Sequence, residues 1–281
     1  MENGKTVKII IAAHKAYQMP EDEMYLPLHV GAEGKDLDLG FTKDNTGDNI
    51  SSLNPSFCEL TGLYWAWKNL DEDYLGLAHY RRHFQGKKND DPFKSILTYD
   101  ELKKDLGKIR IFVPTKRKYV IESLYSHYAH THYAVQLDAT RGIIEKKYPE
   151  YVESYDKVVN QTSGFMFNMM IMEKELFDDY CNWLFDILFT LKDELGANSS
   201  DSSPNQKIDM PELSAFQARF YGRISEIIFN VWLDYQIKTN RVKENQIKEL
   251  KMINLEGEKW SKKIGLFLKA KYLGEKYEQS Q

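Results

Sequence analysis

Cysteine is scarce in this chain: Cys58 and Cys181 are the only two among 281 residues. Two isolated cysteines form neither a disulfide framework nor the paired cysteine ligands of a structural zinc site. The sequence therefore predicts a protein of a reducing compartment such as the cytosol.

Long apolar runs and an excess of positive charge are also missing. No stretch approaches the roughly 18 apolar residues of a spanning helix, and the polar start at 1–8 is unlike a signal peptide. Lysine and arginine number 38 against 42 acidic residues, a net charge of −4, which disfavours nucleic acid as a partner. We expect a cytoplasmic protein, either free or peripheral on the inner face of the cell membrane.

Apolar runs alternate with amphipathic stretches along the chain, and the two patterns predict strands and helices respectively. The expected strands are 7–13, 26–30, 74–78, 109–113 and 164–171; the expected helices are 57–69, 99–106, 121–148, 151–159, 173–191 and 211–239. This alternation predicts an α/β fold with a mainly parallel sheet flanked by helices over 1–240, followed by a helical C-terminal extension at 241–281.

The strand expected at 74–78 ends abruptly in the polar run HYRRH at 79–83. Open α/β sheets build binding sites from polar groups at the carboxyl ends of buried strands. The adjacent Arg81 and Arg82 can grip diphosphate oxygens by charge and bidentate hydrogen bonds, as a divalent cation would. The alternative is that both arginines form structural ion pairs with a neighbouring helix.

No metal or other cofactor is expected. Asp71 and Asp73 match the D-x-D pattern of metal-dependent glycosyltransferases, but they precede the strand at 74–78 and so lie at the wrong end of the sheet. The histidine cluster HYAHTH at 127–132 lacks the further converging ligands of a zinc site. We favour surface positions or acceptor contact for these histidines, with His130 as the candidate for binding an acceptor.

Several single residues are further candidates. Glu226 lies on a strongly apolar helical stretch and can act as a general base, or can pair with Arg223 three residues earlier. Asn168 interrupts an apolar strand and is either a core amide or a ligand of a sugar hydroxyl. Glu59 and Tyr64 can both point toward a nucleotide cleft, although packing explains such a helix face as well.

The tail at 256–281 spaces Trp260, Ile264 and Phe267 as on one helix face, among several lysines. A basic amphipathic helix with an aromatic margin is the form of an interfacial membrane anchor. The alternative is a helix that docks on the core of its own domain.

A set of motifs in a fixed order resembles a bacterial family of capsular and exopolysaccharide glycosyltransferases, first described as a domain of unknown function. The motifs are VGAE (30–33), DNTGDNIS (44–51), ELTGLYWAWKN (59–69), GLAHYRRHF (76–84), KKYPEY (146–151), FMFNMMIMEKELF (165–177) and YGRISEIIFNVWL (221–233). Together they span nearly the whole chain except the tail.

The resemblance implies a GT-A-like fold and a nucleotide-sugar donor, because some members transfer galactofuranose from UDP-galactofuranose with inversion. It implies that His79, Arg81 and Arg82 meet the diphosphate and the sugar. The residues that it places in or beside the uridine pocket are His14, Lys15, Val30, Gly31, Ala32, Asp48, Asn49, Glu59 and Tyr64.

The resulting hypothesis is a metal-independent glycosyltransferase that moves a sugar from a UDP-sugar to a cell-surface polysaccharide or lipid-linked oligosaccharide. Glu226 is the leading candidate for the base, and Arg81 or Arg82 stabilises the departing UDP. The alternative is a non-catalytic carbohydrate- or nucleotide-binding subunit of a polysaccharide assembly complex. A nucleotidyltransferase is disfavoured, because HKAYQMP at 14–20 provides no glycine-rich phosphate loop.

Overall fold

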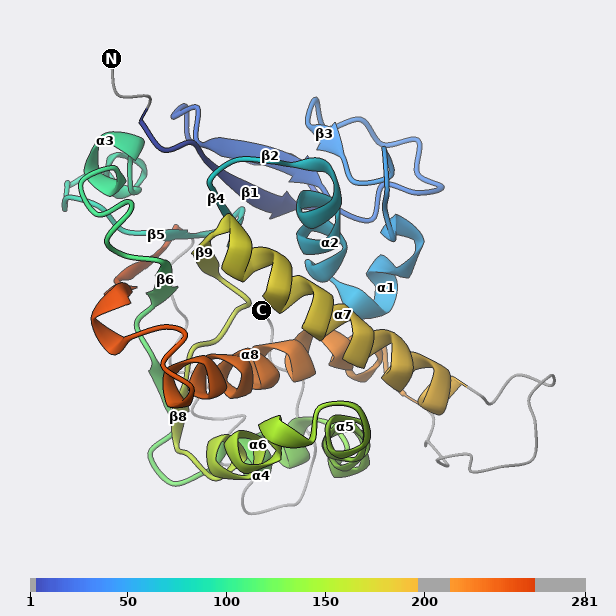
Figure 1. Cartoon of the computed structure of the whole chain (residues 1–281). Coiled ribbons are helices and arrows are strands. Elements are labelled where there is room, and N and C mark those ends of the chain that lie inside the picture. The colour runs from blue at the N-terminus through green and yellow to red at the C-terminus, as the bar shows by residue number, and fades with distance from the viewer. Residues whose placement is uncertain (1–3, 197–212, 256–281) are drawn as a thin grey trace.

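The computed structural model describes residues 4–196 and 213–255 (Figure 1). The strands are β1 (Val7–Ala13), β2 (Tyr25–His29), β3 (Thr42–Lys43), β4 (Tyr74–His79), β5 (Arg82–Phe84), β6 (Ile111–Pro114), β7 (Arg117–Lys118), β8 (Ser163–Gly164), β9 (Met170–Glu173), β10 (Ile247–Leu250) and β11 (Met252–Asn254). The α-helices are α1 (Asn54–Phe57), α2 (Leu60–Asn69), α3 (Tyr99–Leu102), α4 (Leu124–Thr131), α5 (Ala134–Lys147), α6 (Val152–Val159), α7 (Lys174–Gly196) and α8 (Phe220–Lys238).

A mixed sheet forms the centre of the described residues, in the order β10-β6-β9-β4-β1-β2-β3. β1 runs parallel to β2 and β4, with Ile10 opposite Leu26 on one side and Leu77 on the other. β9 runs antiparallel to both β4 and β6, and β5 runs antiparallel to β4, so the mainly parallel sheet expected from the sequence contains reversed strands. Because β1, β2 and β4 are parallel, the residues that follow them emerge at the same edge of the sheet.

Both faces of the sheet are covered. Ile9, Ile10 and Ile11 of β1 are all fully buried, although their side chains alternate between the two faces. Ile10 belongs to the larger core under α2, α7 and α8, whereas Ile9 and Ile11 meet Ile96 and Leu102 of the segment around α3. α7 and α8 lie side by side, and α4, α5 and α6 form a further layer beyond α8 (Figure 1).

The helix expected at 121–148 is divided into α4 and α5. Two further elements differ from the sequence prediction because the chain turns inside buried segments. The helix expected at 57–69 is interrupted at Cys58, whose φ of 55° and ψ of −131° separate α1 from α2. The strand expected at 164–171 is divided into β8 and β9 by Phe167 and Asn168, which both have positive φ. An apolar run indicates that a segment is buried, but not that its backbone is extended. Here the side chain of Asn230 on α8 forms the backbone hydrogen bonds that a neighbouring strand would otherwise form.

The described residues after α8 complete the sheet. Residues 247–254, which the sequence pattern places in the helical extension, form β10 against β6 and β11 against β5. The helix expected at 256–281 lies outside the described residues. Within the described ranges, no helix is both long enough and apolar enough to cross a bilayer.

Candidate functional site

A cavity of about 400 Å³ opens where the carboxyl ends of β1, β2 and β4 meet. The predicted site residues that line this cavity are His14, Val30, Glu59, His79, Arg81 and Arg82. The edge of the sheet therefore brings together side chains from three strand ends and from the start of α2.

The β4–β5 hairpin positions the two arginines. His79 pairs with Arg82 across the hairpin, so that Tyr80 and Arg81 form its turn. The buried Tyr80 ring has the His14 ring on its edge at 5.3 Å between centroids, and the Arg81 Cζ 5.0 Å from its centroid. Arg82 lies over the ring of Phe167, with its Cζ 4.8 Å from the centroid. The aromatic rings thus hold the guanidinium groups beside the cavity.

Positive charge dominates the cavity. The charged lining residues are Lys35, Arg81, Arg82 and Arg219 against the single carboxylate of Glu59. The pKa of His14 is lowered first by burial and then by the nearby cations Lys15, Arg219, Arg81 and Lys35. Because its pKa is lowered, the imidazole is neutral at neutral pH. The positive charge of the lysine and arginine side chains would attract an anion into the cavity.

A left-handed turn at Phe167 and Asn168 holds two potential catalytic groups. The Asn168 side-chain amide donates to Glu59 Oε1 at 2.8 Å and to the Gly222 carbonyl at 3.1 Å. His79 Nε2 donates to the Phe167 carbonyl at 2.6 Å, which leaves Nδ1 as the acceptor atom of the ring. Burial lowers the pKa of His79, so this imidazole is neutral. Asn168 is buried and contacts the site through Glu59 rather than by lining the cavity.

Asp44 anchors the turn that contains Gly31 and Ala32. Its fully buried carboxylate accepts hydrogen bonds from the backbone N–H of Gly31 at 2.8 Å and of Ala32 at 3.0 Å. It also accepts from the hydroxyls of Thr61, at 2.7 Å, and Ser51. Gly31 and Ala32, predicted as donor-binding residues, do not line the cavity, although their neighbour Val30 does.

Alanine at Gly31 is expected to destabilise the protein more than alanine at Gly34. Both glycines have positive φ, 66° and 68°, so each substitution introduces a backbone strain of about 1 kcal/mol. At Gly31 a Cβ would also lie 2.3 Å from Oδ1 of Asn54, whereas at Gly34 nothing lies within 4 Å. We expect a loss of about 2–4 kcal/mol for Gly31→Ala in urea unfolding. Equal losses for the two variants would contradict the close approach of Asn54.

Asp48, Asn49 and Tyr64, predicted as donor-binding residues, do not line the cavity. The Tyr64 hydroxyl donates to Asp48 Oδ1 at 3.2 Å, and the side chain of Asn69 pairs with the backbone of Asp48. The Tyr64 ring packs edge-on against Phe185 at 5.1 Å. These residues attach the loop before α1 to the far end of α2.

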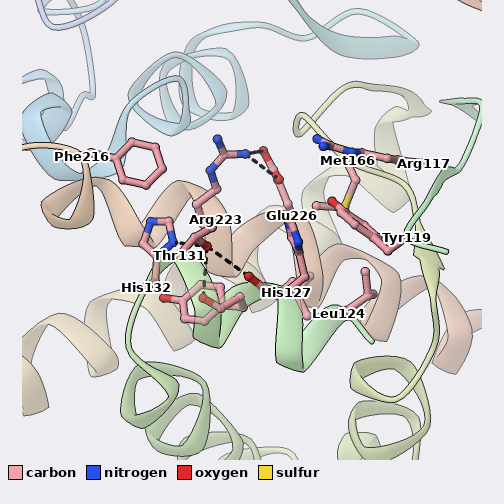
Figure 2. A pocket seen from close by; sticks show the side chains of 12 residues that line it. Arg117, Tyr119, Leu124, His127, Thr131, His132, Met166, Phe216, Arg223 and Glu226 are labelled. Carbon is pink, nitrogen blue, oxygen red and sulfur yellow. Dashed lines mark hydrogen bonds and ion pairs between the residues drawn. The ribbon is translucent and has the colours of Figure 1, made fainter. Parts of the chain in front are cut away.

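Glu226 occupies a different and much smaller cavity of about 30 Å³ (Figure 2). It is buried, and Arg223 Nη1 donates to both of its carboxylate oxygens at 3.1 and 3.2 Å. Of the two alternatives open from the sequence, the structure thus contains the ion pair. A space of this size holds about one water molecule and no sugar.

His130, the candidate for acceptor contact, is about half exposed on α4 and does not line either cavity. Its Nδ1 bonds the carboxylate of Glu122, which also bonds Nδ1 of His127 at 2.8 Å. The expected histidine cluster is therefore organised around an acidic side chain.

The acidic run before β4 lies at the opposite edge of the sheet from the cavity. Asp73 accepts hydrogen bonds from Lys5 Nζ and from the Thr6 backbone, both at 2.8 Å, and so joins the starts of β1 and β4. Asp73 thus lies at the end of the sheet that the sequence pattern predicts for it, away from the cavity. Among the described residues, no group of three His, Cys, Asp or Glu side chains is arranged to hold a metal ion.

Several residues that sequence reasoning did not select also line the cavity, among them Lys35, Asn54, Cys58 and Arg219. Arg219 Nε donates to the Cys58 thiol at 3.0 Å, although the two residues are 161 positions apart. Burial raises the pKa of Cys58 to about 11, so the thiol stays protonated. The contact of α1 with the short 3₁₀ turn at Gln217–Arg219 brings this arginine to the site. No local sequence pattern predicts that contact.

A family model described as a domain of unknown function, DUF4422, matches residues 8–238. The chain belongs to this family. Its structure is similar to that of WbbM, described as a bifunctional glycosyltransferase, in the apo form. The TM-score is 0.77 at 30% identity, covering 90% of this chain and 46% of WbbM. The DUF4422 chain thus spans about half the length of WbbM, and no curated protein matches it. The likeness confirms the GT-A-like α/β fold.

Proposed function

We propose that this DUF4422 protein is a glycosyltransferase that uses a UDP-sugar as donor and a saccharide as acceptor. The observation that carries the proposal is the convergence of Arg81, Arg82, Arg219 and Lys35 on one cavity that also contains the carboxylate of Glu59. Guanidinium groups match the oxygens of a diphosphate in charge and geometry. The structural likeness to WbbM supports the same reaction class.

In the proposed reaction, the acceptor hydroxyl attacks the anomeric carbon while the bond from that carbon to the UDP oxygen breaks. Glu59 takes the hydroxyl proton, and UDP leaves with its additional negative charge stabilised by Arg81 and Arg82. Asn168 keeps the Glu59 carboxylate in place, and Nδ1 of His79 can accept a hydrogen bond from a sugar hydroxyl. Attack opposite the leaving group inverts the anomeric centre.

The placement of the base differs from the expectation drawn from the sequence. Glu226 is enclosed with Arg223 in a space that admits about one water, whereas Glu59 faces the cavity that contains Arg81 and Arg82. We therefore propose Glu59 for this role. Support for galactofuranose as the transferred sugar, and for a cell-surface or lipid-linked acceptor, comes from the family resemblance.

Turnover of a UDP-sugar is expected to persist in excess EDTA, because the proposed charge stabilisation comes from guanidinium groups. The initial rate of UDP release should remain within about twofold of its untreated value. Removal of a catalytic metal would lower the rate far more, because such a metal stabilises the transition state by several kcal/mol. Loss of activity in EDTA, restored by manganese, would refute the metal-independent mechanism.

Thermal unfolding with UDP, GDP, CDP and dTDP tests the donor class itself. UDP at 100 times its Kd should stabilise the protein by about 2.7 kcal/mol, and the other nucleotides by less. Stabilisation by UDP without turnover of any UDP-sugar would favour the non-catalytic binding subunit. An absence of stabilisation by every nucleotide would remove the donor proposal.

A further inference from the structure

The loop between β7 and α4 exposes apolar side chains to an unusual degree. Among the described residues, the large hydrophobic side chains that are exposed to solvent are Leu37, Val120 and Ile121, with exposed fractions of 47%, 92% and 59%. Val120 and Ile121 are neighbours, and their flanking residue Tyr119 is buried. The two β-branched side chains therefore form a small apolar tip that is exposed to solvent and follows a buried tyrosine.

Positive charge adjoins this apolar tip. Lys116, Arg117 and Lys118 precede it and are separated from it by Tyr119 alone, and the lysines are exposed. Lys116 and Arg117 lie over the rings of Phe165 and Tyr119, with Nζ 4.9 Å and Cζ 5.0 Å from the respective centroids.

The acidic residue of the same segment is bonded to histidines of α4, since the carboxylate of Glu122 bonds the ring nitrogens of His127 and His130. Three cations less one carboxylate leave residues 115–123 with a net charge of +2. Exposed aliphatic side chains beside a basic cluster match the two layers of an anionic bilayer surface, which are acyl chains and negative headgroups.

We propose that residues 116–121, the basic tip, dock this protein on an anionic lipid bilayer. Val120 and Ile121 enter the interface, while the exposed Lys116 and Lys118 contact the headgroups and Arg117 adds positive charge behind them. The partner is thus a lipid surface of negative charge, and the contact needs no other part of the chain.

The basic tip is connected directly to the site. β7 pairs with β8, with Arg117 opposite Gly164. The chain continues from β8 to Phe167 and Asn168, whose carbonyl and side-chain amide hold His79 and Glu59. Figure 2 shows Arg117 beside Met166 of this connecting segment. A docked bilayer would thus contact the hairpin that leads to the residues bonding His79 and Glu59; any consequence for catalysis rests on the proposed function, whereas the docking itself does not.

Cosedimentation of the full chain with vesicles tests the proposal. Vesicles of phosphatidylcholine with and without phosphatidylglycerol are compared for Lys116→Gln with Lys118→Gln, and for Val120→Ser with Ile121→Ser. Each cation removed should weaken partition to the anionic vesicles about fivefold, the equivalent of about 1 kcal/mol, so the charge variant should lose about 25-fold. The serine variant should lose at least tenfold.

Two matched controls use residues outside the basic tip. Lys87→Gln with Lys88→Gln removes two exposed lysines from another loop, and Leu37→Ser removes an isolated exposed leucine. Both should change partition less than twofold. Losses equal to those of the tip variants would show that net charge or general hydrophobicity, and not this surface, determines binding.

A fluorescent label reports insertion directly, even where the tail at 256–281 also binds membranes. An environment-sensitive dye on Ile121→Cys should brighten at least twofold and shift to the blue with anionic vesicles, and the same dye on Leu37→Cys should not; Cys58 and Cys181 are buried. The proposal would be overturned if the protein bound vesicles while the fluorescence of the dye at 121 stayed unchanged, or if the protein did not bind vesicles at all. It would also be overturned if the protein associated with itself and the serine variant abolished that association. Stabilisation by UDP should be the same in the tip variants, so failure of the donor proposal is seen separately.

Discussion

Glu59→Gln is expected to lower kcat by a factor of about 10²–10⁴, because the variant cannot accept the proton of the attacking hydroxyl. The amide is isosteric and can still bond Asn168, so the fold should be retained. UDP should bind as tightly as before or more tightly, because the substitution removes the carboxylate from a cavity lined by cations. Initial rates with donor and acceptor, together with UDP titration, measure the two effects.

Glu226→Gln is the matched control for this prediction. The substitution breaks a buried ion pair with Arg223, and such a loss destabilises proteins by about 3–5 kcal/mol. The folded fraction should nevertheless keep most of its turnover. A folded Glu226→Gln protein without activity, beside an active Glu59→Gln protein, would return the role of base to Glu226.

Arg81→Ala should lower kcat/KM by about 10²–10³, the effect of removing one group that stabilises charge developing in the transition state. Arg82→Ala should act in the same direction, because both guanidinium groups line the cavity. Arg81→Lys should recover only part of the loss, since an ammonium group lacks the planar fork that binds two phosphate oxygens.

The control for the arginine variants is Arg141→Ala on α5, which removes a guanidinium paired with Asp156 on the helical layer and away from the cavity. Its kcat/KM should stay within about twofold. If Arg81→Ala and Arg82→Ala both turn over normally, the arginines have no part in the departure of UDP, and the proposed mechanism fails even if the donor is correct.

The strand ends were predictable because a buried strand and its polar terminus are local features. The run VKIIIAA coincides with β1, and the polar residues after β4 reach the cavity as expected. The loop at 44–51 illustrates the limit. Its residue Asp48 was predicted to line a nucleotide pocket, yet it bonds Tyr64 and Asn69, and the contribution of the loop is the buried carboxylate of Asp44.

Local pattern also failed where a buried segment turns. The run at 164–171 is apolar enough for a strand, and nothing in its composition distinguishes an extended path from the left-handed turn at Phe167 and Asn168. That turn decides the site, since it bonds both His79 and Glu59.

The sequence by itself determined the α/β class, the parallel core around β1 and the edge of the sheet at which the arginines emerge. These follow from hydrophobic period and from residues adjacent in the chain. Tertiary structure alone decided that Glu59 and not Glu226 faces the cavity, and that Arg219 joins the cations there. The physical reason is that both outcomes depend on how α8 packs against α1 and on what fills the space between them, and such contacts between distant segments leave no periodic trace in the sequence.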